Sequence, residues 1–269
     1  MMSRPSIEAE RSVVSHPAAR ATAPAPPQKV EGHVVALTAP GSFEAEQYRT
    51  LNLVLERMQP GRPLRVIAVS SPAVGDGKTT TTVNLAVTMA QNPAARVLLV
   101  DADVRRPAVG RKLGLGKVRL PGLVELIADP SLGIGGLARR VGPANLSVLL
   151  AGRSHADPFD VLRSPRFEEF LRQARESYDS VVLDTPPLLM VPDCRQLSAW
   201  VDGILLVVAA HRTPRRLVEE ALNVMEPDRL VGLVFNGDDR PLSGYYRSYR
   251  AYGYPPRLAR AAARRPRLR

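Results

Sequence analysis

Short runs of apolar residues, many of them β-branched, alternate along this chain with segments in which apolar residues recur at three- and four-residue steps. The short runs predict buried β-strands at residues 64–69, 97–100, 146–150, 181–183, 203–209 and 230–235. The stepped segments predict helices at residues 42–58, 78–91, 123–128, 165–178 and 215–225. In the first of these, the predicted apolar face consists of Tyr48, Leu51, Val54 and Leu55. Continuous apolar strands that alternate with helices are typical of an α/β fold, a mostly parallel sheet with helices on both faces.

This pattern is confined to the middle of the chain. Residues 1–30 are rich in Ala, Pro, Ser and charge with few large apolar side chains, and they predict a disordered leader. Residues 241–269 are rich in Tyr, Gly, Pro and Arg without a periodic apolar face, and they predict a flexible tail. We therefore expect one α/β domain over residues 31–240 between two disordered ends.

Charge and cysteine content limit the possible partners and the cellular compartment of the protein. The formal net charge is +11, and residues 257–269 contain six Arg and no acid. Such a tail suits nucleic acid, an anionic membrane face or an acidic partner. Cys194 is the single cysteine, so neither an intramolecular disulfide nor a cysteine zinc cluster can form, which fits a reducing cytoplasm. The longest apolar run, residues 204–210, is far shorter than the roughly 20 residues that cross a bilayer, so we expect any membrane role to be peripheral.

The turn between the first predicted strand and the helix that follows has the composition of a phosphate-binding loop. Residues 70–80 read Ser-Ser-Pro-Ala-Val-Gly-Asp-Gly-Lys-Thr-Thr, with Pro72 where the usual pattern has Gly. Gly75 and Gly77 allow the backbone N–H groups to approach a phosphate at the helix N-terminus. The residues expected to contact the nucleotide in this loop are Gly75, Asp76, Gly77, Lys78, Thr79 and Thr80.

Two side chains of this loop carry specific chemistry. Lys78 is expected to reach the β- and γ-phosphates, and the Thr79 hydroxyl to bind Mg²⁺. A glycine-rich turn that merely contains a lysine is the simpler alternative. The strand before the loop and the helix after it are where a phosphate-binding loop requires them, which favours nucleotide binding.

Three acids follow predicted strands. Asp101 and Asp103 end the strand at 97–100, and Asp184 ends the strand at 181–183. A single Asp after a strand is ordinarily a turn residue or a helix cap. In a parallel sheet, however, ligands bind beyond the carboxyl ends of the strands, and phosphoryl transfer needs a positioned Mg²⁺ and a group that orients the incoming hydroxyl. The three acids are therefore candidates for those tasks.

With these motifs, residues 33–236 resemble the bacterial tyrosine kinases of capsule and exopolysaccharide synthesis, a branch of the partition-ATPase-like P-loop proteins. Three further motifs carry the resemblance: Glu-Gln-Tyr-Arg-Thr-Leu at 46–51, Val-Asp-Ala-Asp-Val-Arg-Arg-Pro at 100–107, and Tyr-Asp-Ser-Val-Val-Leu-Asp-Thr-Pro-Pro at 178–187. The resemblance implies an ATP-dependent protein-tyrosine kinase that autophosphorylates its C-terminal tyrosines and regulates capsular or exopolysaccharide synthesis or export. The implied cofactors are ATP and Mg²⁺.

The resemblance also implies roles for single residues. The implied catalytic residues are Lys78, Asp101, Asp103 and Asp184. Asp101 would assist the tyrosine hydroxyl. The implied metal-binding residues are Thr79, Asp103 and Asp184, the last through water. Asn236 matches a position that contacts the nucleotide base in related ATPases.

The same resemblance implies which tyrosines accept phosphate and which proteins the chain associates with. The implied phosphoacceptors are Tyr245, Tyr246, Tyr249, Tyr252 and Tyr254. A separate membrane polysaccharide co-polymerase would activate the protein, which would be cytoplasmic and would associate with the inner face of the membrane through that partner. A homo-oligomer would form through the tail and the helix that carries Glu46 and Arg49. The family's ring-forming motif, Glu-x-x-Arg-x-x-Arg, is incomplete, because its last position is Asn52.

Three other functions remain open. A partition-type ATPase shares the fold and the acids, but such proteins carry a lysine five residues before the invariant one, where this chain has Ala73. A nucleic-acid-binding protein could use the tail, where aromatic residues alternate with Arg, although the resemblance argues against nucleic acid as a partner. A regulator could bind nucleotide without kinase activity.

Overall fold

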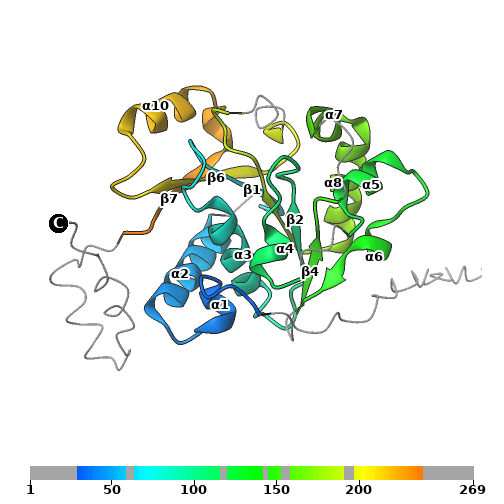
Figure 1. Cartoon of the computed structure of the whole chain (residues 1–269), viewed down its shortest axis with the longest axis horizontal. Coiled ribbons are helices and arrows are strands. Elements are labelled where there is room, and N and C mark those ends of the chain that lie inside the picture. Colours follow the sequence, from blue (N-terminus) through cyan, green and yellow to red (C-terminus); the bar gives the residue numbers. More distant parts are fainter. Residues whose placement is uncertain are drawn as a thin grey trace, which may run out of the picture.

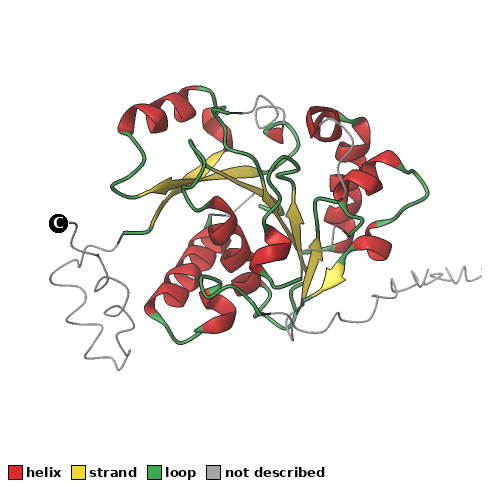
Figure 2. Cartoon of the chain, viewed as in Figure 1, coloured by secondary structure: helices red, strands yellow, loops and turns green. Residues whose placement is uncertain are grey.

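The computed structural model describes residues 29–58, 64–115, 120–141, 145–152, 158–190 and 197–238. The predicted leader, apart from residues 29 and 30, and the predicted tail lie outside these ranges. Within them, the strands form one seven-stranded sheet in the order β3-β4-β2-β5-β1-β6-β7. Helices cover both sides of the sheet (Figures 1 and 2). The predicted α/β fold is confirmed.

The strands lie close to their predicted positions. Their bounds are β1 Val66–Ser70, β2 Val97–Asp101, β3 Arg139–Arg140, β4 Leu146–Leu149, β5 Ser180–Asp184, β6 Gly203–Ala209 and β7 Leu230–Asn236. Neighbouring strands are parallel, except that β3 pairs antiparallel with β4 at one edge. The two-residue strand β3 was not predicted, because two charged residues carry no apolar pattern.

The helices include the five predicted ones and several single turns. Their bounds are α1 Val35–Thr38, α2 Phe43–Arg57, α3 Lys78–Met89, α4 Val109–Lys112, α5 Leu123–Ala128, α6 Ile134–Leu137, α7 Pro158–Arg163, α8 Pro165–Ser177 and α10 Arg215–Asn223, with a 3₁₀ turn at Pro227–Arg229. At the start of α2, the Ser42 hydroxyl accepts a hydrogen bond from the Ala45 N–H, as expected of an N-cap. The helices of four to six residues that were not predicted are too short to show a period.

Two apolar cores lie on the two faces of the sheet. Alternate residues of each central strand belong to opposite cores, as in β1, where Val66 and Ala68 join one and Ile67 and Val69 join the other. The first core includes residues of α5, α7 and α8, and the second includes residues of α1, α2 and α3. Burial on both faces explains why the central strands read as continuous apolar runs.

One helical position differs from its prediction. The apolar face of α2 was expected to include Tyr48, Leu51, Val54 and Leu55, but Val54 is 48% exposed. Each three-residue step turns back by about 60° around a helix, so Val54 rotates away from the face that Leu51 and the buried Leu55 share. Val54 is therefore not part of the core.

A buried amide joins the segment around α1 to α3. The Asn84 side chain, in the middle of α3, accepts a hydrogen bond from the Ala36 N–H at 2.9 Å. Its amide nitrogen donates to the carbonyl oxygens of His33 at 2.9 Å and Thr80 at 2.8 Å. Because α3 begins at the phosphate loop, this contact ties the segment around α1 to the helix that carries the loop.

Candidate functional site

The phosphate loop leaves β1 near the centre of the sheet and runs into α3. Strand β5 lies between β1 and β2, so the carboxyl ends of these three strands meet beside the loop. Gly75 has φ +91° and Gly77 has φ +95°, a conformation that favours glycine. A Cβ atom at Gly77 would also overlap the Asn236 amide. Both glycines are therefore required by the loop conformation, and Gly77 is also required by the close approach of Asn236 at the end of β7.

Lys78 lies among the carboxylates at these strand ends. Its Nζ is 2.7 Å from Asp103 Oδ2 and 3.6 Å from Asp184 Oδ1. The Thr79 hydroxyl donates to Asp184 Oδ2 at 2.7 Å, and the Thr82 hydroxyl is 3.3 Å from the other oxygen of the same carboxylate. The structure thus brings together four residues that the sequence placed in the site, and adds Thr82.

Asp101 completes this buried charge cluster, which we define as Lys78, Asp101, Asp103 and Asp184. Asp101 is the register partner of Asp184 on the neighbouring strand. Its Oδ2 accepts hydrogen bonds from the N–H groups of Ala108 at 3.1 Å and Val109 at 3.0 Å. Its Oδ1 is buried and has no hydrogen-bond partner among the described residues. A buried carboxylate oxygen without a donor is costly, and a bound ligand or an added proton would satisfy it.

The pKa values of Lys78, Asp101 and Asp184 in this cluster are raised above their ordinary values. Burial lowers the pKa of the Lys78 ammonium, but attraction to Asp184 and Asp103 outweighs burial, and the pKa is raised. Burial raises the pKa of the Asp184 carboxyl, and the nearby Lys78 only partly offsets this. Burial, together with the charge of Asp184, raises the pKa of Asp101 well above its ordinary value. Titratable groups perturbed in this way cluster at functional sites.

The remaining loop residues make different contacts. The Asp76 side chain is buried and accepts hydrogen bonds from the Ala73 N–H at 2.9 Å and from the Thr213 hydroxyl at 2.7 Å. The Asn236 amide donates to the backbone carbonyl of Asp76 at 3.0 Å. The backbone carbonyl of Thr80 accepts a hydrogen bond from the Asn84 side-chain amide. Asp76 and Asn236 thus shape the loop in this structure, and their contact with a nucleotide remains a prediction.

Two residues at the site were not expected from the sequence. Thr82 lies four residues after Lys78, one helical turn along the same face, so the helical period could have indicated it. Thr213 follows β6 and is 137 residues from Asp76, and no motif connects them.

The donor set fits Mg²⁺ bound together with a nucleotide. Among the described residues, no three His, Cys, Asp or Glu side chains form a cage for a metal ion. Mg²⁺ is ordinarily held by one or two carboxylates, waters and substrate phosphates rather than by a protein cage. The paired Asp184 and Thr79 and the Asp103 carboxylate supply hard oxygen donors of this kind.

Other predicted residues lie elsewhere or outside the described ranges. Glu46 and Arg49 form an ion pair of 2.7 Å on α2, and the Asn52 amide donates to Glu56 one turn later. The tyrosines predicted as phosphoacceptors lie outside the described residues, as does Cys194. Among the helices described, none combines the length and the apolarity that a bilayer crossing requires.

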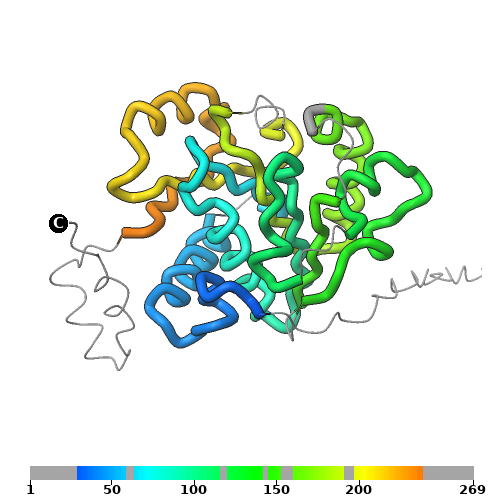
Figure 3. Tube along the Cα trace, viewed as in Figure 1, coloured from blue at the N-terminus to red at the C-terminus, as the bar shows by residue number. Residues whose placement is uncertain are grey.

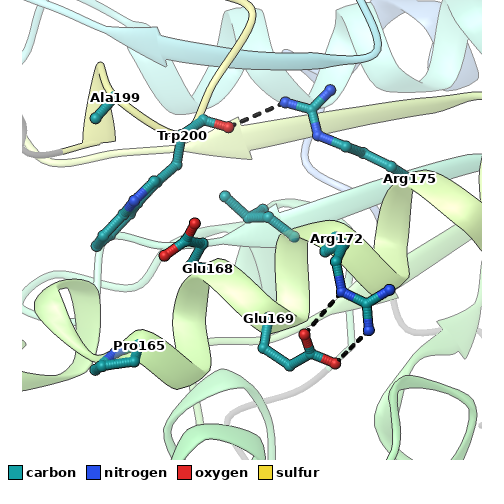
Figure 4. A pocket seen from close by; sticks show the side chains of 8 residues that line it. Pro165, Glu168, Glu169, Arg172, Arg175, Ala199 and Trp200 are labelled. Atoms are coloured by element: carbon teal, nitrogen blue, oxygen red, sulfur yellow. Dashed lines mark hydrogen bonds and ion pairs between the residues drawn. The ribbon is translucent and has the colours of Figure 1, made fainter.

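A cavity of about 380 Å³ lies away from this site, beside α8 (Figure 4). Its walls come from α8 and from the segment before β6, namely Pro165, Glu168, Glu169, Leu171, Arg172, Arg175, Ala199 and Trp200. The Glu169 carboxylate accepts from Arg172, and Arg175 donates to the Trp200 carbonyl. The cavity shares no residue with the phosphate loop or with the buried charge cluster.

Known proteins are similar to this chain in sequence and fold. A family model described as the CobQ/CobB/MinD/ParA nucleotide binding domain matches residues 67–237. The chain is 32% identical over 214 residues to the tyrosine-protein kinase YwqD of Bacillus subtilis (strain 168), a match that covers 78% of this chain and 87% of YwqD.

A longer relative and a solved structure are also similar. The chain is 33% identical over 224 residues to the succinoglycan biosynthesis transport protein ExoP of Rhizobium meliloti (strain 1021), covering 80% of this chain but only 28% of ExoP. The kinase domain of the Escherichia coli tyrosine kinase ETK superposes with a TM-score of 0.70 at 25% identity, over 76% of this chain and 79% of that domain.

Proposed function

This chain belongs to the bacterial tyrosine-protein kinases of the CobQ/CobB/MinD/ParA nucleotide-binding family, and we propose that it transfers the γ-phosphate of ATP to tyrosines, including those of its own tail. The observation that carries the proposal is the placement of Lys78 between Asp103 and Asp184 at the carboxyl ends of parallel strands, directly after a phosphate-binding loop. Ligands bind at this edge of such sheets.

Different residues of the chain have different roles in phosphoryl transfer. The backbone N–H groups of the loop and the N-terminus of α3 bind the phosphates, and Lys78 moves from its carboxylate partners to the transferred phosphate. Asp103, Asp184 and Thr79 would hold Mg²⁺, Asp184 through water, and the bound ion would neutralise charge on the phosphates. In the reaction, the tyrosine oxygen bonds to the γ-phosphorus as the bond to the β–γ bridging oxygen breaks and ADP leaves.

Asp101 is the residue best suited to receive the tyrosine proton. Its Oδ1 is free of hydrogen bonds within the described structure. Burial and the neighbouring Asp184 charge raise its pKa, which makes it a stronger base than an exposed carboxylate. Oδ2 is fixed by two backbone N–H groups, so the side chain is oriented before the substrate arrives.

The position of β7 supports the tail as an acceptor. Asn236 ends β7 and touches the phosphate loop, so the chain leaves the described domain at Asp238 beside the site. Tyr245 follows Asp238 by seven residues, a span of up to about 25 Å in an extended chain. The other acceptors proposed are Tyr246, Tyr249, Tyr252 and Tyr254, within the same molecule or a neighbouring one.

We infer a role at the cytoplasmic face of a membrane through a partner. ExoP is named as a succinoglycan biosynthesis transport protein, and this chain matches 28% of its length. We propose that a membrane polysaccharide co-polymerase activates this chain, and that copies associate through α2 and the tail. The incomplete motif at Asn52, whose side chain pairs with Glu56 on its own helix, weakens the case for a ring.

The test is incubation with Mg²⁺-ATP, with and without a cytoplasmic peptide from a candidate co-polymerase, followed by mapping of phosphotyrosine. We expect phosphate mainly on the five tail tyrosines, more of it with the activating peptide, and little when all five are Phe, while nucleotide binding is unchanged. Lys78→Met is the inactive control. Nucleotide hydrolysis without phosphotyrosine, with an activator present, would favour a partition-type ATPase instead. Phosphate mainly on Tyr48 or Tyr178 would refute the tail as the acceptor.

A further inference from the structure

The turn that follows β6 lies against the phosphate loop, although the two are far apart in sequence. The Thr213 hydroxyl donates to Asp76 Oδ1 at 2.7 Å, and the same hydroxyl oxygen accepts from the Ala209 N–H at 3.0 Å. The Arg212 guanidinium reaches the Gly75 carbonyl at 3.4 Å. In Figure 3 the loop after β1, in cyan, rises toward the gold segment between β6 and α10.

The backbone of this turn is specifically shaped. His211 has φ +60°, and it is the only non-glycine residue with positive φ in the described structure. This left-handed conformation is uncommon for a residue with a side chain and persists when surrounding contacts enforce it. The His211 ring lies 3.0 Å from Asp238, just past the end of β7. The turn is therefore held to the end of β7 on one side and to the phosphate loop on the other.

The contact addresses a problem inherent in this loop. Asp76 places a carboxylate between the two glycines that are to cradle phosphate, where a negative charge would repel a nucleotide. In the structure both carboxylate oxygens are engaged: Oδ2 accepts from the Ala73 N–H within the loop, and Oδ1 accepts from Thr213 outside it. Only 5% of Asp76 is exposed. Thr213 supplies the contact that fixes this carboxylate to the body of the domain.

We propose that Thr213 is a positioning residue of the nucleotide site: its hydroxyl restrains the Asp76 carboxylate and so fixes the phosphate loop in its binding conformation. The proposal rests on the nucleotide binding proposed above. Thr213 does not contact the nucleotide, and it acts through Asp76. The methyl group of Thr213 is not required, so serine is an adequate substitute and valine, which has the same shape without the hydroxyl, is not.

The experiment compares Thr213→Val with Thr213→Ser by titration with a fluorescent ADP analogue and Mg²⁺. A lost hydrogen bond to a buried charge predicts a dissociation constant about tenfold higher in the valine variant, and within about twofold of wild type in the serine variant. In an Asp76→Asn background the effect of Thr213→Val should shrink severalfold, because the restrained charge is absent and the two residues are coupled. Equal affinities in the valine variant and wild type, equal losses in both variants, or full additivity with Asp76→Asn would each overturn the proposal.

A second readout separates this proposal from the proposed function. Hydrogen exchange at the Ala73 amide, which is bonded to Asp76, is measured without nucleotide. We expect faster exchange in Thr213→Val than in Thr213→Ser or wild type, with Thr213→Ala as the alternative if valine prevents folding. If wild type fails to bind nucleotide, the proposed function is wrong, and the exchange data alone decide whether Thr213 restrains the loop. Unchanged exchange in both hydroxyl-free variants contradicts the restraint.

Discussion

Two ion pairs of equal length occupy opposite environments in this protein. At the strand ends, Lys78 lies 2.7 Å from Asp103, and the two side chains are 11% and 5% exposed. On the outer surface of α8, Arg172 also lies 2.7 Å from Glu169, with side chains 59% and 39% exposed. The distance alone therefore says little about what either pair does.

The difference in burial indicates that the two ion pairs have different roles. The α8 pair stays hydrated and screened, and such pairs contribute little to stability. The pair at Lys78 has lost its water and stands among further buried acids, an arrangement that is poorly explained by stability, because apolar side chains would fill the same space at less cost. The buried ion pair is explained if its charges bind a nucleotide and a metal ion.

The largest effect is expected where a buried acid has no substitute. Asp184→Asn keeps the size of the side chain and one of the two oxygens that accept from Thr79 and Thr82, but it removes the charge. We expect phosphotyrosine formation to fall about 1,000-fold or more, as for the loss of other essential electrostatic groups. The measurement is the initial rate of transfer from Mg²⁺-ATP, with thermal melting to establish that the variant is folded. A folded variant with near-normal transfer would show that Asp184 is structural.

Lys78→Met breaks the buried pair from its cationic side. Without nucleotide at neutral pH, we expect the free energy of unfolding to fall by about 3 kcal/mol, because two carboxylates remain buried without their cation. The deficit should shrink as the pH falls, because the Asp184 carboxyl, whose pKa burial raises, becomes protonated. Denaturant unfolding at several pH values tests both statements.

Lys112→Met is the matched control for that variant. Lys112 is similarly buried, with 12% of its side chain exposed, but its partner Glu31 is 32% exposed and hydrated. We expect a smaller loss of stability in this control and no loss of nucleotide affinity. A control that loses as much as Lys78→Met would show that burial of any lysine, rather than the buried acids around Lys78, sets the size of the effect.

A third prediction concerns pH. Because the pKa of Asp101 is raised in the folded protein, the folded state binds its proton more tightly than the unfolded chain does, and stability is lost as pH rises from about 4 through the folded pKa. An asparagine side chain cannot titrate, so Asp101→Asn should be more stable than wild type without nucleotide or Mg²⁺, by a margin that widens as pH rises. Parallel stability curves for the two proteins over pH 4 to about 8 would contradict the raised pKa.

The smallest effect is expected on α8. Hydrogen bonds from Arg172 and Gln173 lower the pKa of Glu169 to about 2. Arg172→Gln should return that pKa toward its ordinary value, seen by NMR of the carboxyl carbon, while the melting temperature at neutral pH changes by about 1 °C or less. A larger loss of stability would show that exposed ion pairs contribute substantially to the stability of this protein, contrary to the comparison above.

Much of the site was predictable from sequence because its residues adjoin apolar strands. Lys78, Asp103 and Asp184 each follow such a run closely, and in a parallel sheet the carboxyl ends of strands share one edge. The sequence did not reveal that β5 lies between β1 and β2, which puts Asp184 opposite Asp101. Strand order depends on packing between distant segments, and periodicity carries no information about it.

The contacts that were missed are those made by single polar residues across long stretches of sequence. Thr213 and Asp76 are 137 residues apart, and Asn84 and His33 are 51 apart. Each is an ordinary residue for its local element, so composition and period do not distinguish it. Only the folded arrangement shows that one hydroxyl contacts Asp76 of the phosphate loop and that one amide joins α1 to α3.

The most direct test of the buried charge cluster as a phosphoryl-transfer site is one rate comparison. Phosphotyrosine formation from Mg²⁺-ATP is measured side by side for wild type, Lys78→Met and Lys112→Met, with a candidate activating peptide present throughout. We predict transfer in wild type and in Lys112→Met at similar rates and none above background in folded Lys78→Met. Equal rates in all three proteins, or equal loss in both lysine variants, would contradict the assignment.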